Sequence, residues 1–216
     1  MIDIQKDENG LDKIEFSTKN EGKFHYFINN LKEKDKIALI SHIDLDGIAS
    51  AKVFNEIINF EILKFIDYDG LNNELANELK KSKINKVIFT DLNISDIKVI
   101  KNIENFAEIL IIDHHVFKEN YNSDKTIFIN AQGFCTAYIL YYLISKIKNL
   151  EEIEWLVAFA SLSDWQFFNN QNFMKGVYKK YGYEFTSDKE NVRKNKFWDL
   201  QYNLSLTVSY FKDNLI

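Results

Sequence analysis

The sequence contains no proline, one cysteine and one arginine among its 216 residues. The single cysteine, Cys135, cannot form an internal disulfide, which is consistent with the reducing environment of the cytoplasm, and we expect a cytoplasmic protein. Because Arg193 is the only arginine, contacts to phosphate groups have to come mainly from lysine, histidine, backbone amides or metal ions.

Long apolar runs and an excess of positive charge are also missing. No apolar segment reaches the roughly 18 residues that span a bilayer, and the first residues do not have the pattern of a signal peptide, so no membrane association is expected. A net charge of −5 argues against a surface that binds nucleic acid over its whole extent. The hydrophobic content of 46% is typical of a folded protein with a substantial core.

Short apolar runs alternate with segments of helical period up to about residue 132, which predicts an α/β fold with a parallel sheet of about five strands flanked by helices. We expect strands at Lys36–Ser41, Glu61–Ile66, Lys86–Thr90, Glu108–Ile112 and Thr126–Ile129. The helices expected among these strands are Gly22–Glu33, Gly47–Asn59, Asn72–Lys81 and Ser95–Glu104. The C-terminal portion is expected to be helical, at Gly133–Lys148, Glu151–Ser163, Phe168–Tyr181 and Arg193–Asn214. Asn9-Gly10 is a turn signal within a short N-terminal hairpin.

Acidic and histidine side chains follow several of the predicted strands. In a parallel sheet, ligands bind outside the carboxyl ends of the strands. His42, Asp44 and Asp46 follow the first strand, and in extended backbone their spacing presents them to a common point. The alternative is that Asp44 and Asp46 are turn and helix-cap residues beside a solvated His42.

Three further segments carry the same residue types. Asp91 follows the third strand, Asp113-His114-His115 follows the fourth, and Asp164 ends an apolar helix, where a nearby cation would explain a carboxylate better than a cap would. By itself, Asp91 is also compatible with a simple cap or turn. Together the segments hold five aspartates and three histidines without a thiolate, a set that suits Mn²⁺ and, less well, Mg²⁺ or Zn²⁺. That is more ligands than one ion needs, so we expect two ions about 3.5–4 Å apart, as in catalysts of displacement at phosphorus.

In this order and spacing the motifs resemble those of the DHH phosphoesterase superfamily, over roughly residues 36–166. The resemblance implies that two manganese ions are held by His42, Asp44 and Asp91 and by Asp46, Asp91, His114 and Asp164. It further implies that Asp91 bridges the ions, that His115 faces the substrate phosphate and that Asp113 orients the imidazoles, so that Asp91, His115 and Asp113 are the expected catalytic residues. Thr136, near the start of a helix, is an expected second contact to phosphate.

The spacing of the first motif narrows the expected activity. One residue separates His42 from Asp44, whereas the pyrophosphatases of the superfamily have three residues in the corresponding place. This favours a RecJ-like exonuclease or nanoRNase that cleaves single-stranded DNA, RNA or short oligonucleotides. Two alternatives remain: a phosphoesterase for cyclic dinucleotides or other small substrates, and a non-catalytic subunit of a replication or repair complex.

The resemblance also divides the chain. We expect an N-terminal extension and helix at residues 1–35, the catalytic DHH domain at 36–166 and a helical segment at 167–216, without the second substrate-binding domain of most superfamily members. The chain would then be a catalytic-domain fragment, a minimal member of the superfamily, or a subunit whose missing substrate-binding surface comes from a protein partner. Residues 175–196 are locally basic, through Lys175, Lys179, Lys180, Lys189, Arg193, Lys194 and Lys196. These cations form either an ordinary solvated surface or a patch that guides a nucleic-acid strand.

Overall fold

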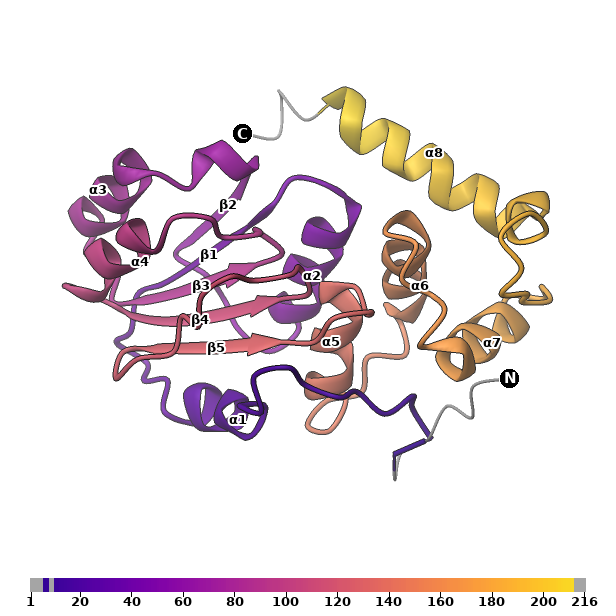
Figure 1. The fold of residues 1–216 in the computed structure, drawn as a ribbon, viewed down its shortest axis with the longest axis horizontal. Helices are drawn as coiled ribbons and strands as arrows, with labels where there is room; N and C mark the ends of the chain where they lie inside the picture. The colour runs from indigo at the N-terminus through magenta and orange to yellow at the C-terminus, as the bar shows by residue number, and fades with distance from the viewer. Residues whose placement is uncertain (1–5, 8–9, 212–216) are drawn as a thin grey trace.

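A computed structural model describes residues 6–7 and 10–211. Five strands form one parallel sheet in the order β2-β1-β3-β4-β5 (Figure 1). Their bounds are β1 (Ile37–His42), β2 (Ile62–Ile66), β3 (Lys86–Thr90), β4 (Glu108–Asp113) and β5 (Thr126–Asn130), each within one residue of the prediction. The α/β class and the parallel sheet expected from the sequence are therefore confirmed.

The strands lie in a register that brings their carboxyl ends to one edge of the sheet. Ser41 at the end of β1 is paired with Thr90 at the end of β3, and Thr90 in turn with Ile112 of β4. β1 and β3 are buried along their whole length, which explains why they read as continuous apolar runs and not as alternating patterns. The chain winds outward in both directions from β1, so a crevice is expected beyond the carboxyl ends of β1 and β3.

Helices cover both faces of the sheet (Figure 1). One apolar cluster joins one face to α3 (Asn73–Lys81) and α4 (Ile97–Glu104). A larger cluster joins the other face to α1 (Gly22–Asn29), α2 (Leu45–Asn55) and α5 (Thr136–Ile144), and continues into the C-terminal helices. These are α6 (Glu154–Ser163), α7 (Gln171–Lys180) and α8 (Lys196–Phe211), and short 3₁₀ turns lie at η1 (Tyr68–Gly70) and η2 (Val192–Lys194). No helix within the described residues is long and apolar enough to cross a membrane.

Several helix boundaries differ from the prediction for local reasons. α2 begins at Leu45, two residues early, because the Asp44 carboxylate accepts a hydrogen bond from the Gly47 N–H at 2.9 Å and caps the helix. α5 begins at Thr136 and not at Gly133, whose φ of +86° is not helical. Of the predicted N-terminal hairpin, Lys6 and Asp12 form an antiparallel bridge, whereas Asn9 lies outside the described residues. The last predicted helical residues, 212–214, lie outside them as well.

Candidate metal centre

The first motif turns from strand to helix and does not stay extended. His42 is the last residue of β1, Asp44 is the N-cap of α2, and Asp46 lies in the first turn of α2. The expectation that the three side chains meet at one point on extended backbone is therefore wrong. His42 Nδ1 lies 2.9 Å from Asp44 Oδ2, whereas the fully buried Asp46 accepts hydrogen bonds from the Thr136 and Ala137 N–H groups at the start of α5.

Gly47 makes this sharp change of direction possible by its lack of a side chain. A Cβ atom at this position would lie 2.1 Å from the carbonyl oxygen of His42. The carbonyl of Gly47 accepts a hydrogen bond of 2.7 Å from the Ser41 hydroxyl, which ties the start of α2 to the end of β1. The glycine is thus required by a close backbone approach between the helix and the strand.

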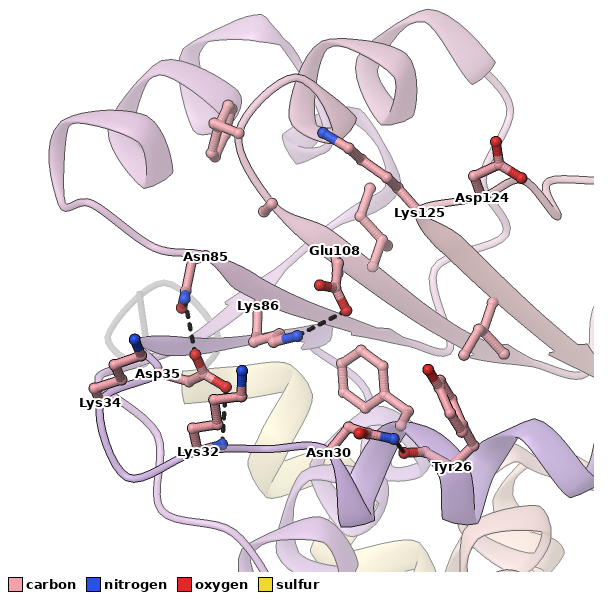
Figure 2. Close-up of a pocket in the computed structure, with 15 residues that line it drawn as sticks. Tyr26, Asn30, Lys32, Lys34, Asp35, Asn85, Lys86, Glu108, Asp124 and Lys125 are labelled. Carbon is pink, nitrogen blue, oxygen red and sulfur yellow. Dashed lines mark hydrogen bonds and ion pairs between the residues drawn. The ribbon is translucent and has the colours of Figure 1, made fainter.

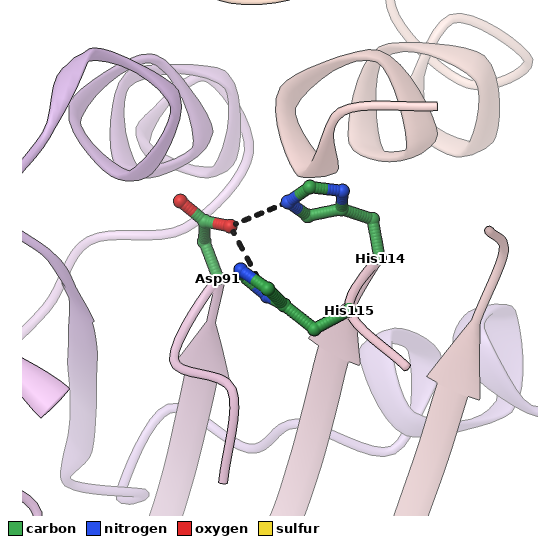
Figure 3. A group of neighbouring side chains, drawn as sticks. All are labelled: Asp91, His114 and His115. Carbon is green, nitrogen blue, oxygen red and sulfur yellow. Dashed lines mark ion pairs between the residues drawn. The ribbon is translucent and has the colours of Figure 1, made fainter. Parts of the chain in front are cut away.

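Asp91 lies at the centre of the cluster. It follows β3 in the left-handed region, with φ of +62°, a conformation that aspartate tolerates better than most residues. Its Oδ1 atom lies 3.3 Å from His114 Nε2 and 3.9 Å from His115 Nδ1 (Figure 3), and its Oδ2 atom lies 3.9 Å from His42 Nδ1. One buried carboxylate therefore faces His42, at the end of β1, and the two histidines that follow β4. These strands lie on either side of β3.

The potential ligands form two groups that share Asp91. His42, Asp44 and Asp91 offer ligand atoms within 4.8 Å of one another. The second group, with the same spacing, consists of Asp46, Asp91, His114 and Asp164. In it, His114 Nε2 lies 3.2 Å from Asp164 Oδ2 and 3.9 Å from Asp46 Oδ2. These are the two sets that the sequence resemblance implied, although Asp91 also groups with His114 and His115.

The atoms that face this space suit divalent cations. His42 Nδ1, Asp91 Oδ2 and His114 Nε2 are buried and, although oppositely charged groups lie within 4 Å of each, none of them makes a hydrogen bond of good geometry within the described residues. Buried polar atoms are rarely left in this state, and three of them in one cluster indicate a missing partner. Carboxylate oxygens and imidazole nitrogens together are a donor set for Mn²⁺ or Zn²⁺.

The electrostatics of the cluster lead to the same conclusion. Burial raises the pKa of Asp91 well above its usual value, and the charge of Asp46 raises it further. For Asp46, burial and the charge of Asp164 likewise raise the pKa. Burial opposes protonation of His114, but its contacts with Asp164 and Asp91 outweigh this and raise its pKa to about 11. The carboxylates thus need compensating positive charge, which a bound cation would supply.

Asp113 holds His115 and the loop after β3. Its Oδ1 atom accepts the His115 N–H at 2.8 Å and lies 2.6 Å from His115 Nδ1. Its Oδ2 atom accepts hydrogen bonds from the Leu92 and Asn93 N–H groups. Burial alone would raise the pKa of Asp113, but these contacts with His115 outweigh it and lower the pKa. Asp113 therefore orients one of the two imidazoles, that of His115.

Thr136 is fully buried, and its hydroxyl donates to Asp91 Oδ1 at 3.2 Å. The structure thus places it against a candidate ligand, where it can hold the Asp91 carboxylate. It does not leave the hydroxyl exposed to a substrate phosphate. Its position at the start of α5, next to the backbone amides that bind Asp46, explains why the segment belongs to the site.

Two residues at the site were not predicted from the sequence. Asp67 and Tyr68 follow β2, and Asp67 Oδ1 lies 3.7 Å from His42 Nε2. The Tyr68 ring stacks on the His42 ring, with centroids 4.3 Å apart and planes at 11°, and its hydroxyl lies 3.5 Å from His115 Nε2. Their signal was positional, since they follow a predicted strand at the same edge of the sheet as the other motifs.

A separate cavity of about 580 Å³ opens at the opposite edge of the sheet, near the amino ends of β3, β4 and β5 (Figure 2). Two of its charged groups pair with each other, and a third accepts hydrogen bonds from neutral groups. Lys86 Nζ lies 2.7 Å from Glu108 Oε2, and the Asp35 carboxylate accepts hydrogen bonds from Asn85 and from the Lys32 N–H. Among the described residues, the groups of carboxylates and histidines that could hold a metal ion all lie at the carboxyl edge, which is therefore the better candidate for chemistry.

Solved structures similar to this one include an exonuclease RecJ bound to manganese, with a TM-score of 0.56 and 14% identity over 73% of this chain and 46% of that one. RecJ from Thermus thermophilus in complex with Mn²⁺ matches with a TM-score of 0.53 and 14% identity, over 81% of this chain and 31% of that one. CDC45 from Entamoeba histolytica matches with a TM-score of 0.53 and 15% identity, over 76% and 37%. At such identities the likeness concerns the fold alone, and this chain spans less than half the length of each neighbour.

No curated protein sequence matches the chain. The model of the DHH family, N-terminal domain, matches residues 36–162, which include His42, Asp91 and the Asp113-His114-His115 tripeptide. Asp164 lies two residues beyond the match, yet its carboxylate reaches His114. With more than half of the chain matched by the family model and the fold shared with RecJ, the chain belongs to the DHH family.

Proposed function

We propose that this protein is a Mn²⁺-dependent phosphodiesterase that hydrolyses single-stranded nucleic acid or short oligonucleotides. The observation that carries the proposal is the pair of ligand groups that share the buried Asp91 carboxylate. Two ions bridged by one carboxylate are an arrangement suited to in-line displacement at phosphorus. The similarity to RecJ structures that contain manganese supports the choice of metal.

In this proposal His42, Asp44 and Asp91 would hold one cation, and Asp46, Asp91, His114 and Asp164 would hold the other. Bound cations would supply Lewis acidity, activate water and neutralise charge that develops on the phosphate. His115, which is fixed by Asp113 and is partly exposed, donates a hydrogen bond to a phosphate oxygen. Thr136 keeps the Asp91 carboxylate in place, because its hydroxyl donates to Oδ1.

The substrate follows from the first motif and not from the structure of a binding domain. The one-residue spacing between His42 and Asp44 supports the RecJ-like and nanoRNase branch. Cyclic dinucleotides are the alternative small substrates. A non-catalytic role, with a partner protein, is compatible with the fold of CDC45, but a chain without catalysis has no need for this complete set of ligands.

A panel of substrates tests the proposal. Wild-type protein and the Asp91→Asn variant are incubated with labelled single-stranded DNA, short RNA, a cyclic dinucleotide and pyrophosphate, each with Mn²⁺ or with a chelator. We expect Mn²⁺-dependent cleavage of a single-stranded substrate, and a loss of about 10³-fold in kcat/KM in the variant, since a bridging ligand contributes several kcal/mol to the transition state.

The outcomes separate the alternatives. If only the cyclic dinucleotide is hydrolysed, the protein is a phosphoesterase for small substrates. If only pyrophosphate is hydrolysed, the assignment to the RecJ-like and nanoRNase branch is wrong. If no substrate is cleaved in a manner that depends on Asp91, the protein is not the proposed enzyme and the non-catalytic role is favoured.

Tyr68 offers a test of the metal group around His42. We expect Tyr68→Ala to weaken Mn²⁺ binding about three- to tenfold, because stacking between aromatic rings contributes about 0.5–1.5 kcal/mol and fixes the His42 imidazole. Tyr68→Phe keeps the stacked ring and should change the affinity less than about twofold. Isothermal titration with Mn²⁺ measures both. Equal affinities for Tyr68→Ala and wild type would show that His42 needs no support from this ring.

A further inference from the structure

The only arginine of the chain lies beside two tryptophans that contact each other, one of which follows a candidate metal ligand in the sequence. The Arg193 guanidinium lies 4.5 Å from the ring centroid of Trp165 and 5.7 Å from that of Trp198. The two tryptophan rings are themselves 5.2 Å apart. Trp165 directly follows Asp164, whose carboxylate belongs to the second ligand group. The best phosphate-binding side chain of the protein therefore contacts the residue that directly follows a candidate metal ligand.

The aromatic contacts continue from Trp165 to a second cation. Phe167 lies 5.8 Å from Trp165 and 4.3 Å from Phe168, and Lys189 Nζ lies 5.3 Å from the Phe168 centroid. We call these rings, Trp198, Trp165, Phe167 and Phe168, the aromatic row; Phe167 is fully buried, and the other three rings are partly exposed. Within residues 6–7 and 10–211, neither Arg193 nor Lys189 forms an ion pair or a side-chain hydrogen bond. Both positive charges are thus available to an anion.

The backbone at Trp165 is unfavourable for a residue with a large side chain. α6 ends with hydrogen bonds from the Trp165 N–H to the Leu162 carbonyl and from the Gln166 N–H to the Ser161 carbonyl. In this type of helix end the residue at position 165 is left-handed and is usually glycine. Trp165 has a φ of +56°, a conformation that is unfavourable for a bulky side chain. An indole ring thus follows Asp164 at a position where glycine would be less strained.

The segment that contains Arg193 also restricts the position of this residue before any ligand binds. Arg193 lies in η2, where the neighbouring Val192 is fully buried in the core. The Asp188 carboxylate accepts hydrogen bonds from the Glu190 and Asn191 N–H groups and orders the turn before η2. Because backbone and ring contacts restrict the guanidinium before a ligand arrives, less conformational entropy is lost on binding.

We propose that Arg193 and Lys189, on the aromatic row, bind backbone phosphates of a single-stranded nucleic acid next to the phosphate that lies at Asp91. This inference rests on the proposed function and identifies the strand-binding surface. A chain of net charge −5 with an acidic centre needs local cations to attract a polyanion. Cations combined with aromatic side chains are typical of proteins that bind single strands without sequence preference.

Binding of a labelled strand tests the proposal in the full-length chain. In an Asp91→Asn background that prevents cleavage, fluorescence anisotropy measures the affinity for a single strand of about 12 nucleotides at several salt concentrations. We expect Arg193→Gln to weaken binding about tenfold and to reduce the slope of log K against log salt by about 0.7, the value for one phosphate contact on a single strand. Lys194→Gln is the matched control, since Lys194 is adjacent, exposed and bonded to Asn191, without a ring contact.

Two further measurements separate a binding role from a structural one. Thermal unfolding of each variant shows whether Arg193 only fastens η2 to α6, in which case stability falls while the affinity of the folded protein is unchanged. With Asp91 intact, Arg193→Gln should reduce kcat/KM more for the long strand than for a dinucleotide. An affinity and a salt slope equal to those of Lys194→Gln would overturn the inference. If cleavage that depends on Asp91 persists at the same time, the proposed function stands without it.

Discussion

Replacing Gly47 by alanine is expected to destabilise the protein by about 3 kcal/mol or more, because the added methyl group has no space. Its Cβ would lie 2.1 Å from the carbonyl oxygen of His42 and 2.6 Å from the carbonyl carbon. Both atoms belong to the backbone of a buried strand, so they cannot rotate away as a side chain would. The start of α2 and the end of β1 would have to separate, and His42, Asp44 and Asp46 would be displaced with them.

Thermal and urea unfolding measure this effect. For a domain of this size, a loss of 3 kcal/mol lowers Tm by roughly 6–12 °C. Gly176→Ala is the matched control, since this glycine lies in α7 with no atom within 4 Å of an added Cβ, and alanine is favoured in helices. We expect the control to leave Tm unchanged or raise it slightly. A Gly47→Ala protein with the Tm of wild type would show that the close approach between helix and strand is not required.

Asp91→Asn is expected to remove the response of the protein to Mn²⁺ while leaving the metal-free fold intact. A ligand present at about 100 times its Kd stabilises the folded state by about 2.7 kcal/mol, which raises Tm by about 5–10 °C for a protein of this size. Wild type should show this shift. The variant should shift by less than about 2 °C, because both ligand groups lose their shared carboxylate.

Without metal, the same variant should be at least as stable as wild type. Burial and the nearby charge of Asp46 raise the pKa of Asp91, so its charged form is disfavoured in the absence of cations, and a neutral amide relieves this repulsion. Asp124→Asn, at an exposed position at the other edge of the sheet, is the control for loss of one negative charge. An Mn²⁺-induced shift of wild-type size in Asp91→Asn would contradict the shared-ligand arrangement. The absence of any shift in wild type would contradict a metal centre altogether.

The fold was predictable because its signals are local. β1 and β3 are buried on both sides, and their apolar runs identified them to within one residue. Helix starts were harder to predict, since they depend on particular caps. The helix expected from Ser95 begins at Ile97 as α4, because the Asp96 carboxylate accepts the Lys98 N–H and caps it. Capping by Asp44, which was the alternative role for this residue, likewise makes α2 begin two residues before the predicted start.

The residues of the site were predictable as a set, but their arrangement was not. Parallel strands bring their carboxyl ends to one edge, so Asp91 and His114 had to lie close to the end of β1. The prediction that Asp46 lies on extended backbone was nevertheless wrong. Asp46 lies in the first turn of α2, and its carboxylate accepts hydrogen bonds from backbone amides at the start of α5. Thr136 and Tyr68 show the same limit, since each acts through a contact with a residue more than 25 positions away.

The sequence by itself determined the class of the fold, the positions of the strands and the set of aspartates and histidines that follow them as candidate metal ligands. Periodicity along the chain carries that information, because burial repeats with the geometry of each element. The tertiary structure alone decided that Asp113 holds only one of the two imidazoles, that Tyr68 stacks on His42 and that Arg193 lies on Trp165. These features depend on distances between segments far apart in the chain, and those distances are set by how the helices pack on the sheet, which no local pattern records.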